Sequence, residues 1–142
     1  MGRPDYKAMV AAAKVNPSSA LYAKARAAGM AAAAARVPTP MVVVRHANPL
    51  DDNSPVVKRY EPVMDGVCGF AWIKCRPARG PFFAYCKAEG LGRKDYDGGW
   101  SIWVSDFNQS MERKEAYAYA FAEVLNESPE AGVTAYGQSR MD

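Results

Sequence analysis

The chain has 142 residues, of which 49% are hydrophobic, and a formal net charge of +3 at pH 7. This length and apolar fraction suit one domain with a packed core, with or without an appendage, and exclude a wholly disordered chain. No apolar run reaches the roughly 18 residues that a membrane-spanning helix needs. Asp5, Lys7 and Lys14 interrupt the segment where a secretory signal would lie. We therefore expect a soluble intracellular protein with no membrane partner.

Positive charge is concentrated at the start of the chain. Up to Arg45, seven basic residues face one acid, Asp5, whereas residues 46–142 carry eleven basic and fourteen acidic residues. The two parts therefore have formal charges of +6 and −3. Long-range electrostatic attraction to the basic part favours binding to a polyanion, to an acidic protein surface or to a neighbouring copy of the chain, without fixing the geometry of the contact. The charge distribution predicts a binding function.

Residues 1–40 are predicted to form a basic helical arm that ends in a proline connector. Fourteen of the first 36 residues are alanine, the strongest helix former. Asn16-Pro17 has the composition of a helix start, so we expect two successive helices. Val37-Pro38-Thr39-Pro40 is a stiff extended segment because proline restricts its own φ and the conformation of the residue before it. We place a domain boundary there and expect the arm to bind a partner through its basic side chains, which are Lys7, Lys14, Lys24, Arg26 and Arg36.

Residues 41–142 are predicted to form an α+β body in the order ββαβαβ, with helices mainly on one face of a mixed sheet. Strands are expected at Met41–Val44, Val67–Cys75, Trp100–Val104 and Val133–Tyr136, with a further strand indicated within Val56–Val63. Val67–Cys75 is apolar on both faces, which is typical of a central strand. Helices are expected over residues 82–89, between Gly80-Pro81 and Gly90, and over Met111–Asn126, which Ser110 can cap.

The aromatic residues of the predicted strands are candidates for two roles. Phe70, Trp72, Trp100 and Trp103 lie near basic residues of the body, which are Lys74, Arg76, Arg79, Arg93 and Lys94. Aromatic side chains on a sheet can stack the bases of single-stranded nucleic acid. Packing in the core is the alternative role, and no RNP-like motif surrounds them.

Cysteine and acidic residues give no indication of a metal centre. The three cysteines, Cys68, Cys75 and Cys86, are odd in number and contain no CxxC pair, which argues against both a disulfide framework and a zinc knuckle. We expect free thiols that pack as small hydrophobic groups. Asp51-Asp52 and the pair Asp95/Asp97 are interpreted as solvated loop charges, with binding of a divalent cation as the alternative. No metal, cofactor or catalytic residue is predicted.

The segment Met41-Val-Val-Val-Arg45-His46-Ala47 resembles the opening strand and Arg-His signature of the histidine phosphatase superfamily. That resemblance implies that His46 would accept a phosphoryl group while Arg45 holds its oxygens. The family also uses a second histidine, and His46 is the only histidine in this chain. We therefore expect His46 to be a hydrogen-bonded residue at a strand end, with a phosphohydrolase centred on Arg45 and His46 as an alternative.

A second resemblance concerns residues 65–142 and rests on three segments, which are DGVCGFAWI, GGWSIWVSDFNQSMERKEAYAYAFAEVL and SRMD. In these segments the sequence resembles small uncharacterised proteins encoded by tailed bacteriophages. The resemblance implies a role as a virion component, a nucleic-acid-associated protein or an inhibitor of a host factor, in the host cytoplasm or the virion. It identifies no site residue.

The sequence thus predicts a non-enzymatic, phage-type interaction or assembly protein. It would dock through its basic N-terminal arm on a protein partner or on a second copy of itself. The first alternative is a sequence-nonspecific nucleic-acid-binding protein that uses the same basic residues, and the second is the histidine-phosphatase-like enzyme.

Overall fold

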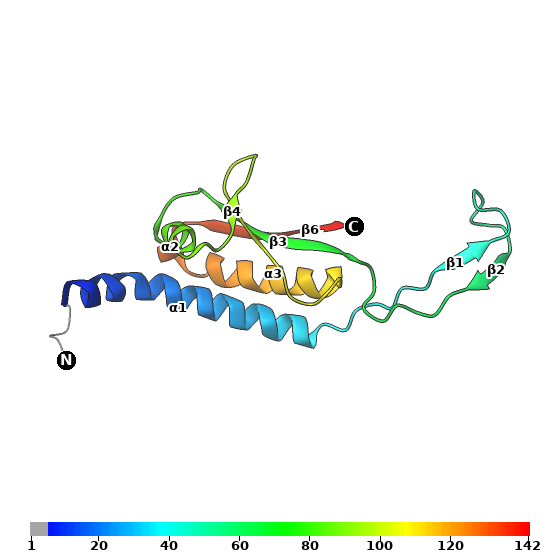
Figure 1. Cartoon of the computed structure of the whole chain (residues 1–142), viewed down its shortest axis with the longest axis horizontal. Helices are drawn as coiled ribbons and strands as arrows, with labels where there is room; N and C mark the ends of the chain where they lie inside the picture. Colours follow the sequence, from blue (N-terminus) through cyan, green and yellow to red (C-terminus); the bar gives the residue numbers. More distant parts are fainter. Residues whose placement is uncertain (1–5) are drawn as a thin grey trace.

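The computed structural model describes the backbone of residues 6–142 and the side chains of residues 17–142. Its elements are helix α1 (Tyr6–Ala35), strands β1 (Val44–His46), β2 (Val56–Arg59) and β3 (Gly69–Arg76), helix α2 (Pro81–Glu89), strands β4 (Arg93–Lys94) and β5 (Trp100–Trp103), helix α3 (Met111–Asn126), the 3-10 turn η1 (Pro129–Ala131) and strand β6 (Thr134–Met141) (Figure 1). The predicted α+β class is confirmed.

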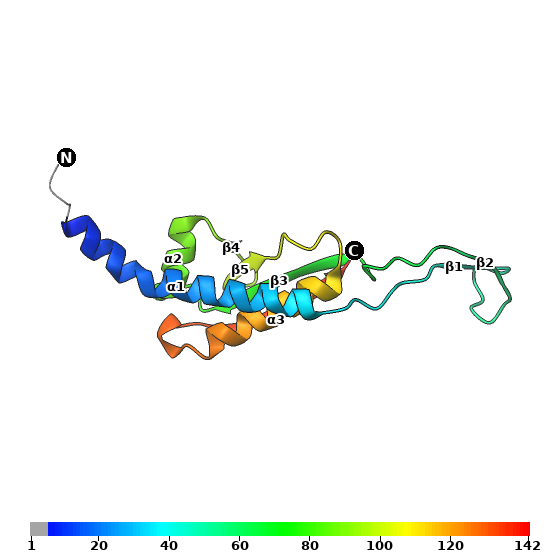
Figure 2. The same ribbon diagram turned by 90° about the horizontal axis from the view of Figure 1, so that it is seen from below.

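The N-terminal segment is one long helix, and the expectation of two helices is wrong. Pro17 lies inside α1. A proline removes one hydrogen bond from a helix without forcing the chain to leave it, and the alanines around it favour continuation. The helix packs along α3 (Figures 1 and 2). Leu21, Ala25 and Ala33 of α1 are buried in the same hydrophobic cluster as α3, so α1 contributes to the core of the body.

The body contains a four-stranded sheet in the order β4-β5-β3-β6, and every pairing in it is antiparallel. The prediction of a mixed sheet is therefore wrong, whereas the central position of the strand after Val67 is confirmed. Helix α3 does return the chain so that β6 runs in the same direction as β5. The two strands do not pair, because β3 lies between them and is antiparallel to both.

Strands β1 and β2 form a separate two-stranded sheet, which the sequence placed in the body. We call residues 41–63 the ribbon; the bridge between Met41 and Val63 lies at its base, next to the body, and it projects from one end of the molecule (Figures 1 and 2). Strand β1 is shifted from the prediction, because it starts at Val44 rather than Met41, whereas β2 lies within the range Val56–Val63 in which a strand was indicated. Proline at positions 38, 40 and 62 keeps the connecting segments extended and out of the main sheet.

The core lies between the sheet and the helices. Alternate residues of β3, Ala71, Ile73 and Cys75, face α3, whose Phe121 and Leu125 are fully buried. Aromatic contacts tie the helices together: the ring of Tyr22 in α1 lies 5.5 Å from Phe121 of α3 and 6.4 Å from Phe82 of α2.

The boundaries of α2 and α3 agree with the sequence signals. Proline begins α2, and Gly90 ends it in the left-handed conformation. At the start of α3, the hydroxyl of Ser110 accepts a hydrogen bond of 3.4 Å from the backbone N–H of Arg113. These helices fix the face of the sheet that is covered, and thereby the face that is left open.

Candidate functional site

The face of the four-stranded sheet that points away from the helices is the candidate site, which we call the open face. The strand register places Phe70 and Trp72 of β3, Trp103 of β5, and Gln138 and Arg140 of β6 on this face. In the part of the chain that the structure describes, no helix lies over this face (Figure 1), and from α3 the ammonium group of Lys114 reaches to 5.6 Å from the ring centroid of Phe70. They are only partly buried or exposed, so the face is available to a ligand.

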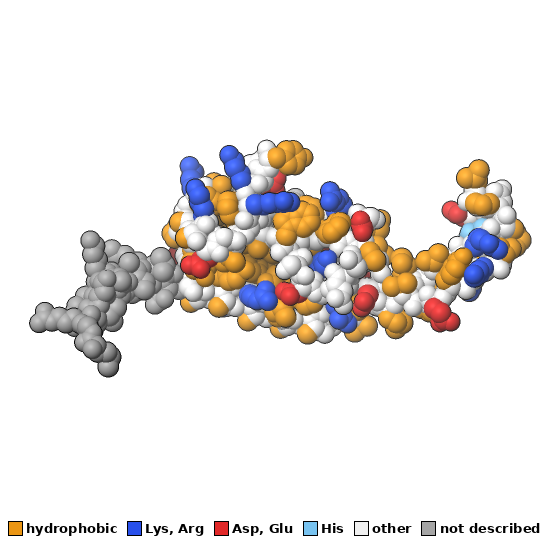
Figure 3. All heavy atoms as spheres, in the orientation of Figure 1, with side chains coloured by type: hydrophobic (Ala, Val, Ile, Leu, Met, Phe, Trp, Pro, Cys, Tyr) orange, Lys and Arg blue, Asp and Glu red, His pale blue; other side chains and the backbone are white. Residues whose placement is uncertain are grey.

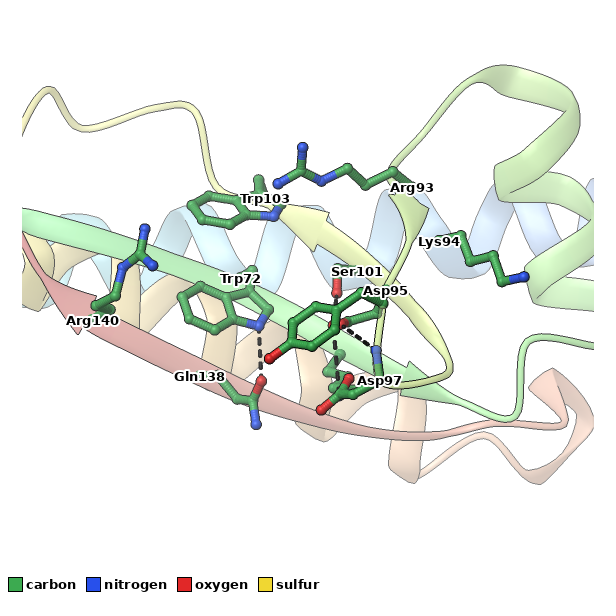
Figure 4. A pocket seen from close by; sticks show the side chains of 11 residues that line it. Trp72, Arg93, Lys94, Asp95, Asp97, Ser101, Trp103, Gln138 and Arg140 are labelled. Atoms are coloured by element: carbon green, nitrogen blue, oxygen red, sulfur yellow. Dashed lines mark hydrogen bonds and ion pairs between the residues drawn. The ribbon is translucent and has the colours of Figure 1, made fainter.

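An aromatic cluster forms the centre of the open face (Figure 4). The rings of Trp72 and Trp103, on neighbouring strands, stack with centroids 5.0 Å apart and planes inclined by 21°. Phe70 meets Trp103 edge to face at 5.9 Å. The indole N–H of Trp72 donates a hydrogen bond of 2.8 Å to Oε1 of Gln138, which holds this ring in place. The result is a continuous apolar surface on an uncovered sheet.

Arginine side chains lie on this surface from two directions. The guanidinium of Arg93, from β4, is 5.3 Å from the ring centroid of Trp103, and that of Arg140, from β6, is 5.5 Å from Phe70. A guanidinium over an aromatic ring gains about 0.5–1 kcal/mol at an exposed site and remains free to bind an anion with its N–H groups. The open face thus combines flat aromatic surface with exposed positive charge.

A buried lysine and two aspartates form the polar wall of the site. Nζ of Lys74, whose side chain is 3% exposed, donates a hydrogen bond to Asp97 and lies 3.5 Å from Oδ2 of Asp95. The hydroxyl of Ser101 donates a hydrogen bond of 2.6 Å to Asp95, and this bond is the main reason why the pKa of Asp95 is lowered to about 2. The hydrogen bond to Asp97 raises the pKa of Lys74. The pair Asp95/Asp97, considered above as a cation site, therefore holds the ammonium group of the chain itself.

These residues line a cavity of about 510 Å³ over the open face. A second cavity, of about 580 Å³, lies on the other side of β5 and reaches Tyr22 and Arg26 of α1. Arg93 and Trp103 line both cavities. The accessible surface therefore continues from the open face around β5 to α1. Lysine and arginine side chains gather over the region of α2 and β4 beside this surface (Figure 3).

Of the basic residues predicted as a binding site on the N-terminal arm, Arg26 and Arg36 contact polar groups of the body. Arg26 donates hydrogen bonds to the hydroxyl of Tyr117 at 3.2 Å and to Asp106 at 3.4 Å, and Arg36 bonds Glu112 at 3.3 Å. Lys24 is exposed on α1. The side chains of Lys7 and Lys14 lie outside the described residues.

The Arg45–His46 pair lies in the ribbon, far from the open face along the molecule (Figure 1). Nδ1 of His46 is 2.9 Å from the backbone carbonyl oxygen of Ser54, so the predicted hydrogen-bonded position at a strand end is confirmed. Whether His46 has a catalytic role stays a prediction.

The thiols of Cys75 and Cys86 are buried, as predicted, and burial raises the pKa of each to about 12. Within residues 17–142, no three His, Cys, Asp or Glu side chains gather closely enough to hold a metal ion.

Sequence reasoning identified the aromatic residues of this face and missed Gln138 and Arg140. The last strand was expected to end at Tyr136, but β6 continues to Met141. Small and large residues alternate through Ala135-Tyr-Gly-Gln-Ser-Arg140, and this period of two residues was the signal that could have extended the strand.

In comparisons with known proteins, no family model, no curated protein and no solved structure matches this chain. Among the described helices, none has the length and apolarity that crossing a membrane requires.

Proposed function

We propose that this protein is a non-enzymatic binding protein that holds single-stranded nucleic acid on its open face. The observation that carries the proposal is the stacked pair Trp72–Trp103, half-buried on a sheet face that no helix covers, with Arg93 over one of its rings. Exposed aromatic residues on a sheet provide flat surfaces on which unpaired bases stack, and nearby arginines contact the phosphates between them.

In this proposal, each part of the face has its own task. Phe70, Trp72 and Trp103 offer stacking surface, while Arg93 and Arg140 offer guanidinium groups from opposite edges of the sheet. The cavity of about 510 Å³ lies within the range that proteins use for small-molecule-sized groups, which includes a nucleotide. Lys74 is neutralised by Asp95 and Asp97, so we expect the exposed arginines, and not Lys74, to bind phosphate.

This proposal keeps the nucleic-acid alternative of the sequence analysis and moves the site from α1 to the sheet. The guanidinium groups of Arg26 and Arg36 each contact a carboxylate of the body, which offsets part of their attraction for phosphate. Stacking on tryptophan also requires bases that are free of a duplex, so single strands should bind more tightly than double strands.

The test is the affinity for a fluorescently labelled single-stranded oligonucleotide, measured by anisotropy. Loss of one stacked base costs about 1–3 kcal/mol, so Trp72→Ala and Trp103→Ala should each weaken binding by a factor of about 5 to 150. Tyr119→Ala, which removes an exposed aromatic ring from α3, is the matched control and should leave the affinity unchanged.

Charge reversal distinguishes the sheet from the helix. Arg93→Glu and Arg140→Glu should weaken binding, whereas Lys24→Glu on α1 should have little effect. If three cations, Arg93, Lys94 and Arg140, contact phosphates, log K should fall against log salt with a slope of about −2 for a single strand. A loss confined to Lys24→Glu, or equal affinity for duplex and single strand, would contradict the proposal.

A further inference from the structure

The ribbon carries more than half of the large hydrophobic side chains that are exposed in the described part of the chain. Of thirteen such side chains, seven lie in the ribbon, and an eighth, Met64, follows directly on it. The seven are Val42, Val43, Leu50, Val56, Val57, Tyr60 and Val63. Exposed apolar surface concentrated in this way marks an interaction site.

The ribbon also lacks the packing that would stabilise it in isolation. It has two strands, β1 and β2, and all four residues of β2 are exposed. A two-stranded ribbon without a covering layer is marginally stable in water, and each of its outer edges presents unpaired backbone groups. A partner that packs on one face of the ribbon and pairs with one of its edges would supply the missing covering layer and bond the unpaired backbone groups of that edge.

The charge of the ribbon strands indicates an acidic partner. The basic residues Arg45, Lys58 and Arg59 lie within β1 and β2, whereas the acids of the ribbon lie outside its strands: Asp51 and Asp52 in the turn that joins them, and Glu61 after β2. Hydrophobic and basic side chains lie side by side on the ribbon (Figure 3).

A groove of matching character lies between α3 and β6. Its volume is about 460 Å³, and its lining includes Ala122, Ala135 and Gly137. Glu123 and Glu127, both exposed, are the charged residues that line it. Strand β6 is an edge strand of its sheet, and the side-chain amide of Asn126 bonds the backbone N–H and C=O of Ala135 at 2.7 Å on its outer edge. Beyond Ala135, no described strand pairs with that edge. The groove thus offers an apolar floor, an acidic rim and a strand edge that is open beyond Ala135.

We propose that the ribbon of one copy of this chain binds in the α3–β6 groove of a second copy. Valines of the ribbon would cover the groove, and a ribbon strand would pair with the outer edge of β6 beyond Ala135. Arg45 and Lys58, which the strand register places opposite each other on one face of the ribbon, would face Glu123 and Glu127. The ribbon of a chain cannot bind in the groove of the same chain, because the two lie at opposite ends of α3. The ribbon projects beyond the start of α3, whereas Glu127 of the groove follows its last residue (Figure 1).

The contact is heterologous, because it joins two different surfaces: the ribbon of one copy and the α3–β6 groove of the other. Such contacts generate a ring if the rotation closes and an open filament if it does not. Self-association of this kind is independent of nucleic acid, so it can fail while the proposed function holds, and the reverse is also possible.

The experiment is light scattering of the full chain, freed of nucleic acid, over a range of protein concentrations. The wild type should grow in mass with concentration. Arg45→Glu with Lys58→Glu, and separately Glu123→Lys with Glu127→Lys, should each weaken self-association by at least about tenfold, because like charges then meet at the contact. Lys87→Glu with Arg79→Glu, on exposed positions outside both surfaces, is the matched control and should assemble like the wild type.

Mixing the two charge-reversed proteins provides the decisive measurement. Each then finds an opposite charge on the other, so the equimolar mixture should regain the mass that neither protein reaches alone. Circular dichroism shows that both variants are folded before mixing. A monomeric wild type, assembly that survives both reversals, or a mixture that stays monomeric would each overturn the proposal.

Discussion

Gly29 of α1 lies directly against the ring of Tyr117 in α3. A Cβ atom placed on Gly29 would come within 2.6 Å of Cδ2 of Tyr117, a separation that side chains do not tolerate. Tyr117 is 3% exposed and its hydroxyl is bonded to Arg26 of the same helix α1, so the ring has little room to move away. The two helices therefore approach closely because position 29 has no side chain.

Gly29→Ala should destabilise the protein even though it improves the helix. Alanine is favoured over glycine in a helix by about 1 kcal/mol, but inserting a methyl group into a packed contact costs about 1–3 kcal/mol. We expect a net loss of about 1 kcal/mol in the free energy of unfolding, measured by urea titration. Gly29→Ser should do at least as much damage, whereas Ala31→Ser at an exposed position of α1 should change stability little. A stabilised Gly29→Ala protein would show that the helices are not in contact there.

Deletion of residues 1–36 tests the domain division at the proline connector. The sequence predicts that residues 41–142 keep a cooperative thermal transition. The structure adds that the deletion removes Leu21 and Tyr22 from the core cluster, and complete burial of one large apolar side chain stabilises by about 1.5–3 kcal/mol. We therefore expect a cooperative transition, followed by calorimetry, at a lower temperature and with about 3–5 kcal/mol less stability. Loss of the transition would mean that α1 cannot be separated from the body.

Stability should decline in alkali because two thiols are buried in the neutral form. Burial raises the pKa of Cys75 and of Cys86 from 9.0 to about 12. Above about pH 9 the unfolded thiols ionise while the folded ones do not, so unfolding releases protons and the free energy of unfolding falls as pH rises toward 12. Denaturant titrations at increasing pH should show this slope. Cys75→Ala and Cys86→Ala should each flatten it, whereas Cys68→Ala, at a partly exposed position, should retain it.

His46→Ala should leave nucleic-acid binding intact and lower stability by no more than about 1 kcal/mol, the typical contribution of one hydrogen bond. The bond lost is the one between its ring and the carbonyl oxygen of Ser54. Hydrolysis of p-nitrophenyl phosphate by the wild type and by the variant is the measurement. Activity that is present in the wild type and absent in His46→Ala would support the phosphatase alternative.

Features with local signals were predictable from the sequence. The ends of α2 follow from Pro81 and Gly90, the start of α3 follows from Ser110, and the alternation from Trp100 to Trp103 places the two indoles on opposite faces of β5. In the candidate site, this alternation separates Trp103 from Trp100 and Ile102, whose side chains point to the other face of the sheet.

Features that depend on distant contacts were not predictable in the same way. The direction of β6 relative to its neighbours depends on β3 lying between β5 and β6. The neutralisation of Lys74 depends on Asp97, which comes 23 residues later on a separate loop. The alanines of α1 did not indicate that this helix packs on α3. Small side chains carry a weak hydrophobic pattern and can pack on any surface that the helix approaches closely.

The stacking of Trp72 on Trp103 has an optical consequence. Two indoles whose centroids are 5.0 Å apart are close enough for their electronic transitions to couple, and we expect this coupling to contribute to the circular dichroism of the protein. Trp100 lies on the other face of the sheet, against Phe83, and has no indole stacked on it. A base that displaces or covers either stacked ring changes the coupling. The protein therefore carries a built-in, label-free reporter for occupation of its open face.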